Sequence, residues 1–204
     1  MSRFSLLLVL ATLFASVPLQ AQRARFGIAV GKGFVGGADS KTAVYLNGDS
    51  VTGGDQAGLH LRAFAEVPLN SPSFKFRGEL FDNRMTSYSN SWAIVGNGIV
   101  KAALEDRTIG LTGSFIAAIK PGARVSPYFL LGAGVFASKL GTNSDPQSSQ
   151  VVMTRSGMGL GLQTGMGLNV RLGQRDLQFE WGYRQALNNT RGAAVMPLTV
   201  GIVF

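Results

Sequence analysis

Apolar side chains recur at every second position through most of the chain, and the final segment shows the pattern most simply. There Met196, Leu198 and Val200 alternate with Pro197 and Thr199. Successive side chains of a β-strand point to opposite faces of a sheet, so the alternation predicts a strand with one apolar face. Eight such segments can be distinguished, at approximately residues 25–35, 58–67, 74–80, 109–119, 128–137, 157–172, 177–184 and 196–204. Segment 128–137 is apolar in both alternations, and the pattern assigns it no facing.

The connections between these segments alternate strictly between long and short. The long ones cover residues 36–57, 87–107, 139–155 and 185–192, and the short ones cover 68–73, 121–122 and 173–175. Transmembrane β-barrels have short turns at one end and longer loops at the other, and an even number of strands brings both chain ends to the turn side. The pattern therefore predicts an all-β fold, an eight-stranded antiparallel up-and-down transmembrane barrel.

The connection at residues 87–107 contains its own turn signal. Gly96-Asn97-Gly98 favours a tight hairpin, so we expect the neighbouring strands to continue beyond the bilayer and turn there. Further along, the apolar alternation of the fourth segment replaces a charged one directly after Arg107. The apolar part, residues 109–119, has the nine to eleven residues that a tilted membrane-crossing strand needs.

The amino terminus has the pattern of an export signal. Arg3 precedes an apolar stretch at residues 4–15, and Ala21 ends a short segment of the type that signal peptidases cleave. We expect residues 1–21 to be a secretory signal peptide and residues 22–204 to be a single barrel domain. The apolar stretch is shorter than the roughly twenty residues of a spanning helix. Membrane residence is therefore expected to come from a closed barrel.

Composition excludes several kinds of chemistry. The sequence contains no cysteine, so disulfides and thiol catalysis are excluded for an exported chain. The formal net charge is +8, and it becomes +7 (8 − 1) once Arg3 leaves with the signal. Large positive charge can indicate nucleic-acid binding. Here the basic residues are scattered among strands and turns, so we expect no nucleic-acid partner.

The alternation that faces away from the apolar side carries long charged side chains. A small eight-stranded barrel has an interior that side chains can fill, and buried charge requires a partner. We predict a structural network of paired charges in the lumen that acts as a plug rather than a conduit, with glycine rows in the first and sixth segments leaving room for it. Its members are Arg62, Glu66, Lys75, Arg77, Glu79, Glu180 and Arg184.

Catalytic interpretations depend on one residue. His60 is the only histidine, which excludes metal sites built on two histidines. Two families of barrel enzyme, the lipid A deacylases and the palmitoyltransferases, pair a histidine with a serine. The deacylase pattern places that serine two residues after the histidine, where this chain has Arg62. We therefore assign no catalytic, cofactor-binding or metal-binding residue, and expect His60 to be a polar interior side chain.

Two features of the apolar side concern the membrane. Trp181 and Tyr183 have amphipathic rings and are predicted to lie at the membrane interface. Phe204 ends the last segment, and this aromatic terminus resembles the signal that the outer-membrane barrel assembly machinery recognises. We expect Phe204 to act as that assembly signal.

Two segments resemble one known family. The sequence SPYFLLGAGV at residues 126–135 is similar to the fifth strand, and LQFEWGYR at residues 177–184 to the seventh strand, of small outer-membrane proteins with an eight-stranded barrel, the opacity-like and OmpA-like barrels. The resemblance implies an exported, integral protein of the bacterial outer membrane. It also implies contact with outer-membrane lipid and lipopolysaccharide, and with barrel assembly machinery and periplasmic chaperones during biogenesis. We expect a monomer without cofactors.

Three functions remain open at this point. The leading hypothesis is a non-enzymatic barrel that supports envelope integrity or displays its loops for surface contact. The alternatives are an outer-membrane enzyme that modifies lipid A and uses His60, and a narrow solute channel through the lumen.

Overall fold

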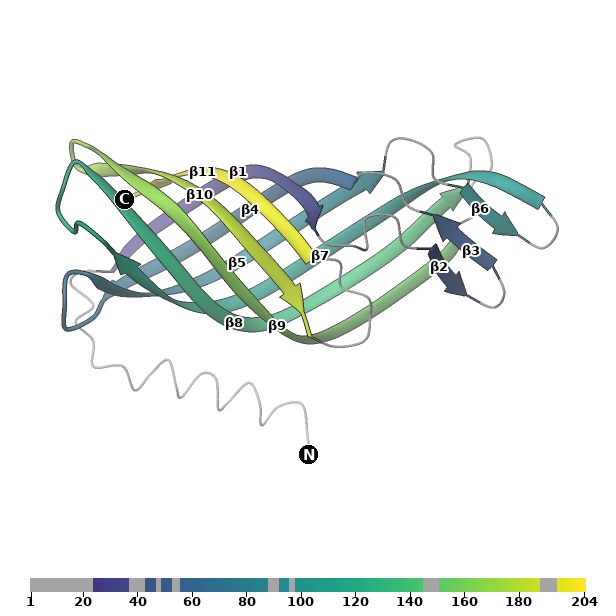
Figure 1. Ribbon diagram of the computed structural model, residues 1–204, viewed down its shortest axis with the longest axis horizontal. Helices are drawn as coiled ribbons and strands as arrows, with labels where there is room; N and C mark the ends of the chain where they lie inside the picture. Colours follow the sequence, from purple (N-terminus) through teal and green to yellow (C-terminus); the bar gives the residue numbers. More distant parts are fainter. Residues whose placement is uncertain are drawn as a thin grey trace, which may run out of the picture.

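The computed structural model describes residues 24–36, 43–46, 49–52, 56–87, 92–95, 98–144, 151–187 and 194–204. The regular elements of these residues are all strands (Figure 1): β1 (Arg25–Gly36), β2 (Ala43–Leu46), β3 (Asp49–Thr52), β4 (Gln56–Pro68), β5 (Phe74–Ser87), β6 (Trp92–Val95), β7 (Gly98–Ala118), β8 (Val125–Ser144), β9 (Val151–Leu172), β10 (Arg175–Ala186) and β11 (Ala194–Val203). No helix in this part of the chain is long and apolar enough to cross a membrane. The expected signal peptide, residues 1–21, lies outside the described residues.

Eight of the strands form a closed antiparallel barrel. Their order is β7-β5-β4-β1-β11-β10-β9-β8, and pairing of β7 with β8 closes the sheet. The first and last strands are neighbours, and the Phe204 amide donates a hydrogen bond of 2.7 Å to the Phe26 carbonyl. Each predicted segment overlaps one barrel strand, so the predicted fold class is confirmed.

Short turns join the strands at the carboxy-terminal end of the barrel, at the left of Figure 1. Gly122 and Gly173 lie in two of these turns with φ of 84° and 66°. Side chains other than glycine rarely adopt these angles, so the two glycines allow the chain to reverse tightly. We call this end of the barrel the turn end and the opposite end the loop end.

The two faces of the wall are reversed relative to a water-soluble protein. Large apolar side chains such as Phe26, Leu131 and Leu160 are 62–67% exposed on the outside. Charged side chains such as Arg77 and Glu66 are at most 2% exposed inside. The facing predicted from the alternation is confirmed for these strands. The facing of β8 is also defined by the structure, with Tyr128, Leu130 and Phe136 inside and Phe129, Leu131 and Val125 outside.

The loop end contains more sheet than the sequence predicts. The prediction of a loop over residues 139–155 is wrong, because β8 continues to Ser144 and β9 begins at Val151. Pairing of Ala102 with Ser144 shows why, since the backbone of β7 provides hydrogen-bonding partners for a polar stretch without any apolar alternation. Strands β7, β8 and β9 are 21, 20 and 22 residues long, whereas β11 has 10. One side of the barrel therefore projects beyond the other (Figure 1).

Three short strands extend this projecting side. Strands β2, β3 and β6 lie within the long connections and join β7 in the order β2-β3-β6-β7. Val95 pairs with Gly98 across the Gly96-Asn97-Gly98 turn, as a two-residue hairpin requires. Residues 96 and 97 themselves lie outside the described residues. The loop end is thus a small antiparallel sheet continuous with the barrel wall.

Candidate functional site

The seven charged side chains singled out in the sequence all lie in the lumen, on three strands. Strand β4 carries Arg62 and Glu66, β5 carries Lys75, Arg77 and Glu79, and β10 carries Glu180 and Arg184. In the order β5-β4-β1-β11-β10, strand β10 lies across the lumen from β4 and β5. Ion pairs between these strands therefore join opposite sides of the barrel rather than neighbours in the sheet.

Glu180 on β10 is the centre of the cluster. Its Oε2 accepts hydrogen bonds from Arg77 Nη1 and from the Tyr128 hydroxyl, both at 2.6 Å. Its Oε1 accepts one from Arg62 Nη1. All four side chains are buried. Three strong donors on one carboxylate compensate for its removal from water, since charge-assisted hydrogen bonds are the strongest available to a protein.

Glu66 is the partner of two basic side chains toward the turn end. It accepts bonds from Lys75 Nζ at 3.0 Å and from Arg77 Nη2 at 2.7 Å. The Lys75 side chain is 19% exposed, whereas that of Arg77 is fully buried. Arg77 therefore links Glu66 to Glu180, and the partly exposed Lys75 ends the cluster toward the turn end.

Glu79 is the partner toward the loop end. Its Oε2 lies 3.1 Å from Arg62 Nη1, and its Oε1 accepts a bond from Arg184. Arg184 also donates through Nη1 to His60 Nε2 at 2.9 Å. Since an arginine N–H donates, His60 accepts at Nε2 and is a neutral imidazole with its proton on Nδ1. The whole cluster has four positive and three negative groups and a net charge of +1.

Aromatic rings lie beside the guanidinium groups. The guanidinium carbon of Arg77 is 4.6 Å from the ring centroid of Phe64, and that of Arg62 is 5.1 Å from the same ring. Arg184 is 4.2 Å from the ring of Phe81. The face of an aromatic ring attracts a cation, more strongly where water is excluded. The rings therefore add to the stabilisation of the buried guanidinium groups that the carboxylates provide.

Three glycines of the predicted rows make room for aromatic rings, whereas the sequence expectation was that the glycines make room for charged side chains. A methyl group built on Gly27 would overlap the ring of Phe64, and one on Gly161 would overlap that of Phe136. Gly167 faces the ring of Tyr128 in the same way. At Gly27 and Gly167 the order across the narrow lumen is therefore glycine, then ring, then the guanidinium of Arg77.

Two members of the network were missed by sequence reasoning. Gln178 is fully buried, accepts a bond from Arg62 Nη2 at 2.8 Å and donates one to Asn169 at 3.1 Å. Its inward position was visible in the alternation of its strand, but its lack of charge kept it out of the prediction. Tyr128 was missed because its strand is apolar in both alternations. The pair Gln163 and Ser114 forms a separate buried hydrogen bond.

The network separates two cavities of the lumen. Glu66 and Lys75 line a vestibule of about 420 Å³ at the turn end, together with Arg25, Arg171 and Asp176. Arg184 and His60 line a void of about 10 Å³ toward the loop end. Arg25 and Asp176 form an ion pair of 2.6 Å in the vestibule wall. The buried ion pairs therefore lie between the vestibule and the small void.

His60 is poorly placed for lipid chemistry. Its side chain is fully buried in the lumen, 5.8 Å from the ring of Phe81, and the barrel wall separates it from the outer surface. Arg62 occupies the place of the serine in the deacylase pattern and is bound in the ion-pair network. Among the described residues, no group of histidine, aspartate and glutamate side chains is arranged to hold a metal ion.

The outward-facing residues singled out in the sequence lie on the wall as follows. Trp181 is 47% exposed on β10, and the Tyr183 hydroxyl is 3.2 Å from Gln185 Oε1. Phe204 is 51% exposed at the turn end, and the guanidinium of Arg175 lies 5.2 Å from its ring centroid. The interfacial and assembly roles of these aromatic residues remain predictions.

Solved structures of bacterial outer-membrane proteins have the same architecture. Neisserial surface protein A matches with a TM-score of 0.57 and 14% identity, over 88% of this chain and 95% of that one. A major outer membrane protein from Thermus thermophilus gives 0.56 and 16%, over 89% and 99%. OprG from Pseudomonas aeruginosa gives 0.53 and 14%, over 89% and 96%. No protein-family model and no curated protein matches the sequence.

At these identities the likeness shows the fold alone. The protein is an eight-stranded antiparallel barrel of the kind found in outer-membrane proteins, as the resemblance of residues 126–135 and 177–184 implied.

Proposed function

We propose that the protein is an integral, non-enzymatic barrel of the bacterial outer membrane that supports envelope integrity or presents its loop end for surface contact. One observation carries the proposal: the wall is apolar outside, while the lumen is filled by a buried ion-paired network. A protein dissolved in water would have these two faces reversed. A catalyst would need an accessible reactive group, whereas His60 is fully buried in the lumen with its Nε2 bonded to Arg184.

Cell fractionation combined with gel mobility tests the location. The protein should be found with the outer membrane, and the unboiled sample should migrate differently from the boiled one, because a folded small barrel resists the detergent. Purified mature protein that remains folded and monomeric in buffer without detergent would contradict the proposal. We also propose that the barrel is a monomer, delivered by periplasmic chaperones and inserted by the barrel assembly machinery.

The projecting side of the barrel supports a surface role. Strands β2, β3 and β6 continue the wall at the loop end, opposite the end of the barrel where Arg25 and Phe204 lie. Replacing residues 39–55 and residues 145–150 by short glycine-serine linkers removes two connections and deletes none of the eight barrel strands. If the protein contacts other cells through this end, cell binding should fall while the boiling-dependent gel shift persists. Unchanged binding would leave envelope integrity as the role.

A narrow channel is the second candidate, because the vestibule of about 420 Å³ leads from the turn end into the lumen. We expect no discrete conductance steps from folded protein in planar bilayers, since the paired side chains beyond Glu66 fill the lumen. Regular steps would support the channel. The enzymatic alternative is tested by His60→Ala, which should leave the lipid A mass spectrum unchanged.

A further inference from the structure

A row of basic side chains crosses the outer wall near the loop end. The strand register places Lys32 beside Leu59, Leu59 beside Arg84, Arg84 beside Arg107, and Arg107 beside Lys139. Neighbouring strands are about 4.8 Å apart, so this row spans roughly 20 Å of the surface. Four of its five members are basic and exposed. The sequence hides the row, because its members are far apart along the chain.

The next row toward the turn end is apolar except at one position. Val30, Leu61, Asp82, Ile109 and Ala137 are neighbours across the same five strands. The boundary between the two rows is therefore a sharp change from basic to apolar surface. Barrel strands are tilted, so this boundary runs obliquely to the membrane plane. On β5 and β7 it places basic side chains directly beside an apolar surface that faces acyl chains.

Asp82 holds two of the arginines in a fixed arrangement. Its carboxylate accepts from Nε and Nη2 of Arg84 at 3.0 and 2.8 Å, and from Nε and Nη2 of Arg107 at 3.0 and 2.9 Å. Arg84 donates both bonds to Oδ2, whereas Arg107 donates one to each carboxylate oxygen, and neither contact uses Nη1. The arginine side chains are 58% and 49% exposed, whereas that of Asp82 is 20% exposed. The three groups together have a net charge of +1.

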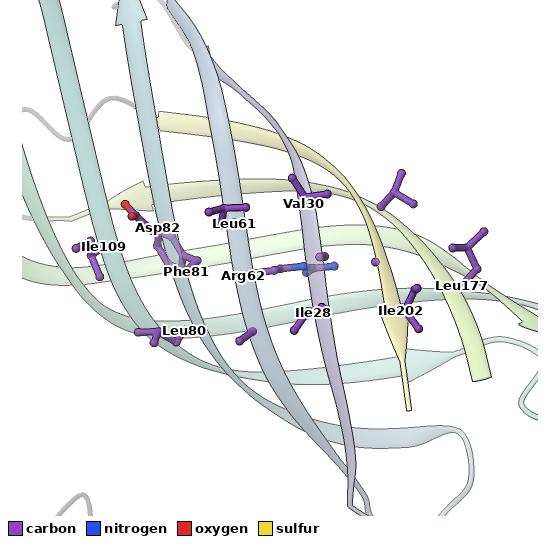
Figure 2. Close-up of a pocket in the computed structure, with 14 residues that line it drawn as sticks. Ile28, Val30, Leu61, Arg62, Leu80, Phe81, Asp82, Ile109, Leu177 and Ile202 are labelled. Atoms are coloured by element: carbon purple, nitrogen blue, oxygen red, sulfur yellow. The ribbon is translucent and has the colours of Figure 1, made fainter. Parts of the chain in front are cut away.

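We call Arg84, Asp82 and Arg107 the clamp. An apolar groove of about 740 Å³ lies on the outer wall next to the clamp, on its turn-end side. Asp82 and Ile109 border it on one side, and Ile202 and Leu177 on the other; Figure 2 shows Leu61 and Leu80 between them. Its floor includes Ala63, whose small side chain lies between larger ones. A groove with a cationic clamp at one end has the chemistry of a lipid with an anionic head and an acyl chain.

We propose that this groove and the Arg84–Asp82–Arg107 clamp bind one phosphate-bearing acyl lipid of the leaflet at the loop end. The inference rests on the proposed location in the outer membrane. The phosphate accepts hydrogen bonds from the two guanidinium groups, for which arginine geometry is well suited. One acyl chain lies in the groove against Ala63. Asp82 is a positioning residue, since it holds both arginines in place and reduces their mutual repulsion.

The test uses the full protein, purified from membranes in a non-ionic detergent, with bisphosphorylated lipid A as the probe. Native mass spectrometry counts retained lipid as its concentration is raised. The wild type should retain one lipid A, and dephosphorylated lipid A should bind much more weakly. Removing the clamp in the double variant Arg84→Ala and Arg107→Ala should weaken binding by roughly tenfold for each arginine, because hydrogen bonds to a charged group contribute about 1.5–3 kcal/mol.

Matched variants separate the site from general effects on the wall. Ala63→Phe fills the groove and should weaken binding, whereas Ala133→Phe makes the same change on the outside of β8 and should not. Arg175→Ala removes an exposed arginine at the turn end and should leave binding unchanged. Every variant must first show the boiling-dependent gel shift, so that loss of binding is separated from loss of folding.

Three outcomes would overturn the proposal. One is equal lipid retention by the clamp double variant and the wild type. Another is displacement of lipid A by inorganic phosphate at the same concentration, which would indicate an anion site without an acyl component. The third is a wild-type dimer that Ala63→Phe converts to a monomer, which would assign the groove to a second copy of the chain. None of these bears on the fractionation result, so the proposed location stands or fails separately.

Discussion

Replacing Glu180 by glutamine tests whether the lumen depends on paired charge. Glutamine has the same shape but no charge, so the cluster's net charge rises from +1 to +2 while Arg62 and Arg77 stay buried. The amide can still accept one bond, but its NH₂ group would then face a guanidinium that is also a donor. Removing one partner of a buried ion pair costs about 3–5 kcal/mol, and we expect the free energy of unfolding to fall by that amount.

The assay is urea unfolding of the protein folded into lipid vesicles. Trp181 lies on the outer face of β10, next in sequence to Glu180, so in a Trp92→Phe background the fluorescence reports whether that strand has left the membrane. The control is the double variant Glu180→Gln with Arg77→Met, which returns the cluster to +1. Its loss should be smaller than the sum of the two single losses, because the residues interact directly.

The result that would refute this reasoning is a Glu180→Gln variant within about 0.5 kcal/mol of the wild type, the range of ordinary surface substitutions. Water would then have to solvate the arginines in the lumen, and the network would not act as a plug. Conductance of the same variant in planar bilayers distinguishes a hydrated lumen from a locally rearranged one, since only the former would pass ions.

Three further changes test the wall and the chain end. Leu160→Arg should lower the free energy of unfolding by about 2–4 kcal/mol if that site is near the bilayer midplane, and undiminished stability would contradict the outward facing of β9. Gly161→Ala should cost about 1–3 kcal/mol in the same urea titration, because the methyl group overlaps the buried ring of Phe136. Phe204→Ser should reduce the fraction of protein that gains the folded gel mobility in cells, whereas Phe74→Ser at the same end should not.

The facing of the strands could be predicted because it depends only on the period of two. Leu160 and Gly161 differ in facing by their positions alone, and the structure agrees with that assignment. Strand ends could not be predicted in the same way. Residues 139–144 are polar or glycine except for Leu140 and lack alternation, yet they form a strand because β7 lies beside them and provides backbone partners. The pairing that makes these residues a strand depends on β7 and cannot be predicted from residues 139–144 alone.

The sequence predicted which charged side chains face the lumen but not which of them form ion pairs with one another. Charged residues of inward parity suggested that pairing must occur, because an unpaired charge could not remain buried. The pairing of Arg77 on β5 with Glu180 on β10 depends on closure of the barrel, which brings together residues far apart in the chain. Tyr128 completes that pair from a strand whose facing the sequence could not assign.

The basic row and the lumen network together explain how a chain with a large positive charge can suit a bilayer. The seven charged side chains of the lumen network have a net charge of only +1, because three carboxylates oppose four cations. Outside this network, Lys32, Arg84, Arg107 and Lys139 form one exposed basic row across neighbouring strands of the wall. Cations at the edge of an apolar belt attract anionic headgroups and resist movement into the acyl chains. Arg84 and Arg107, which we propose bind a lipid phosphate, therefore also resist movement of that part of the wall into the acyl chains.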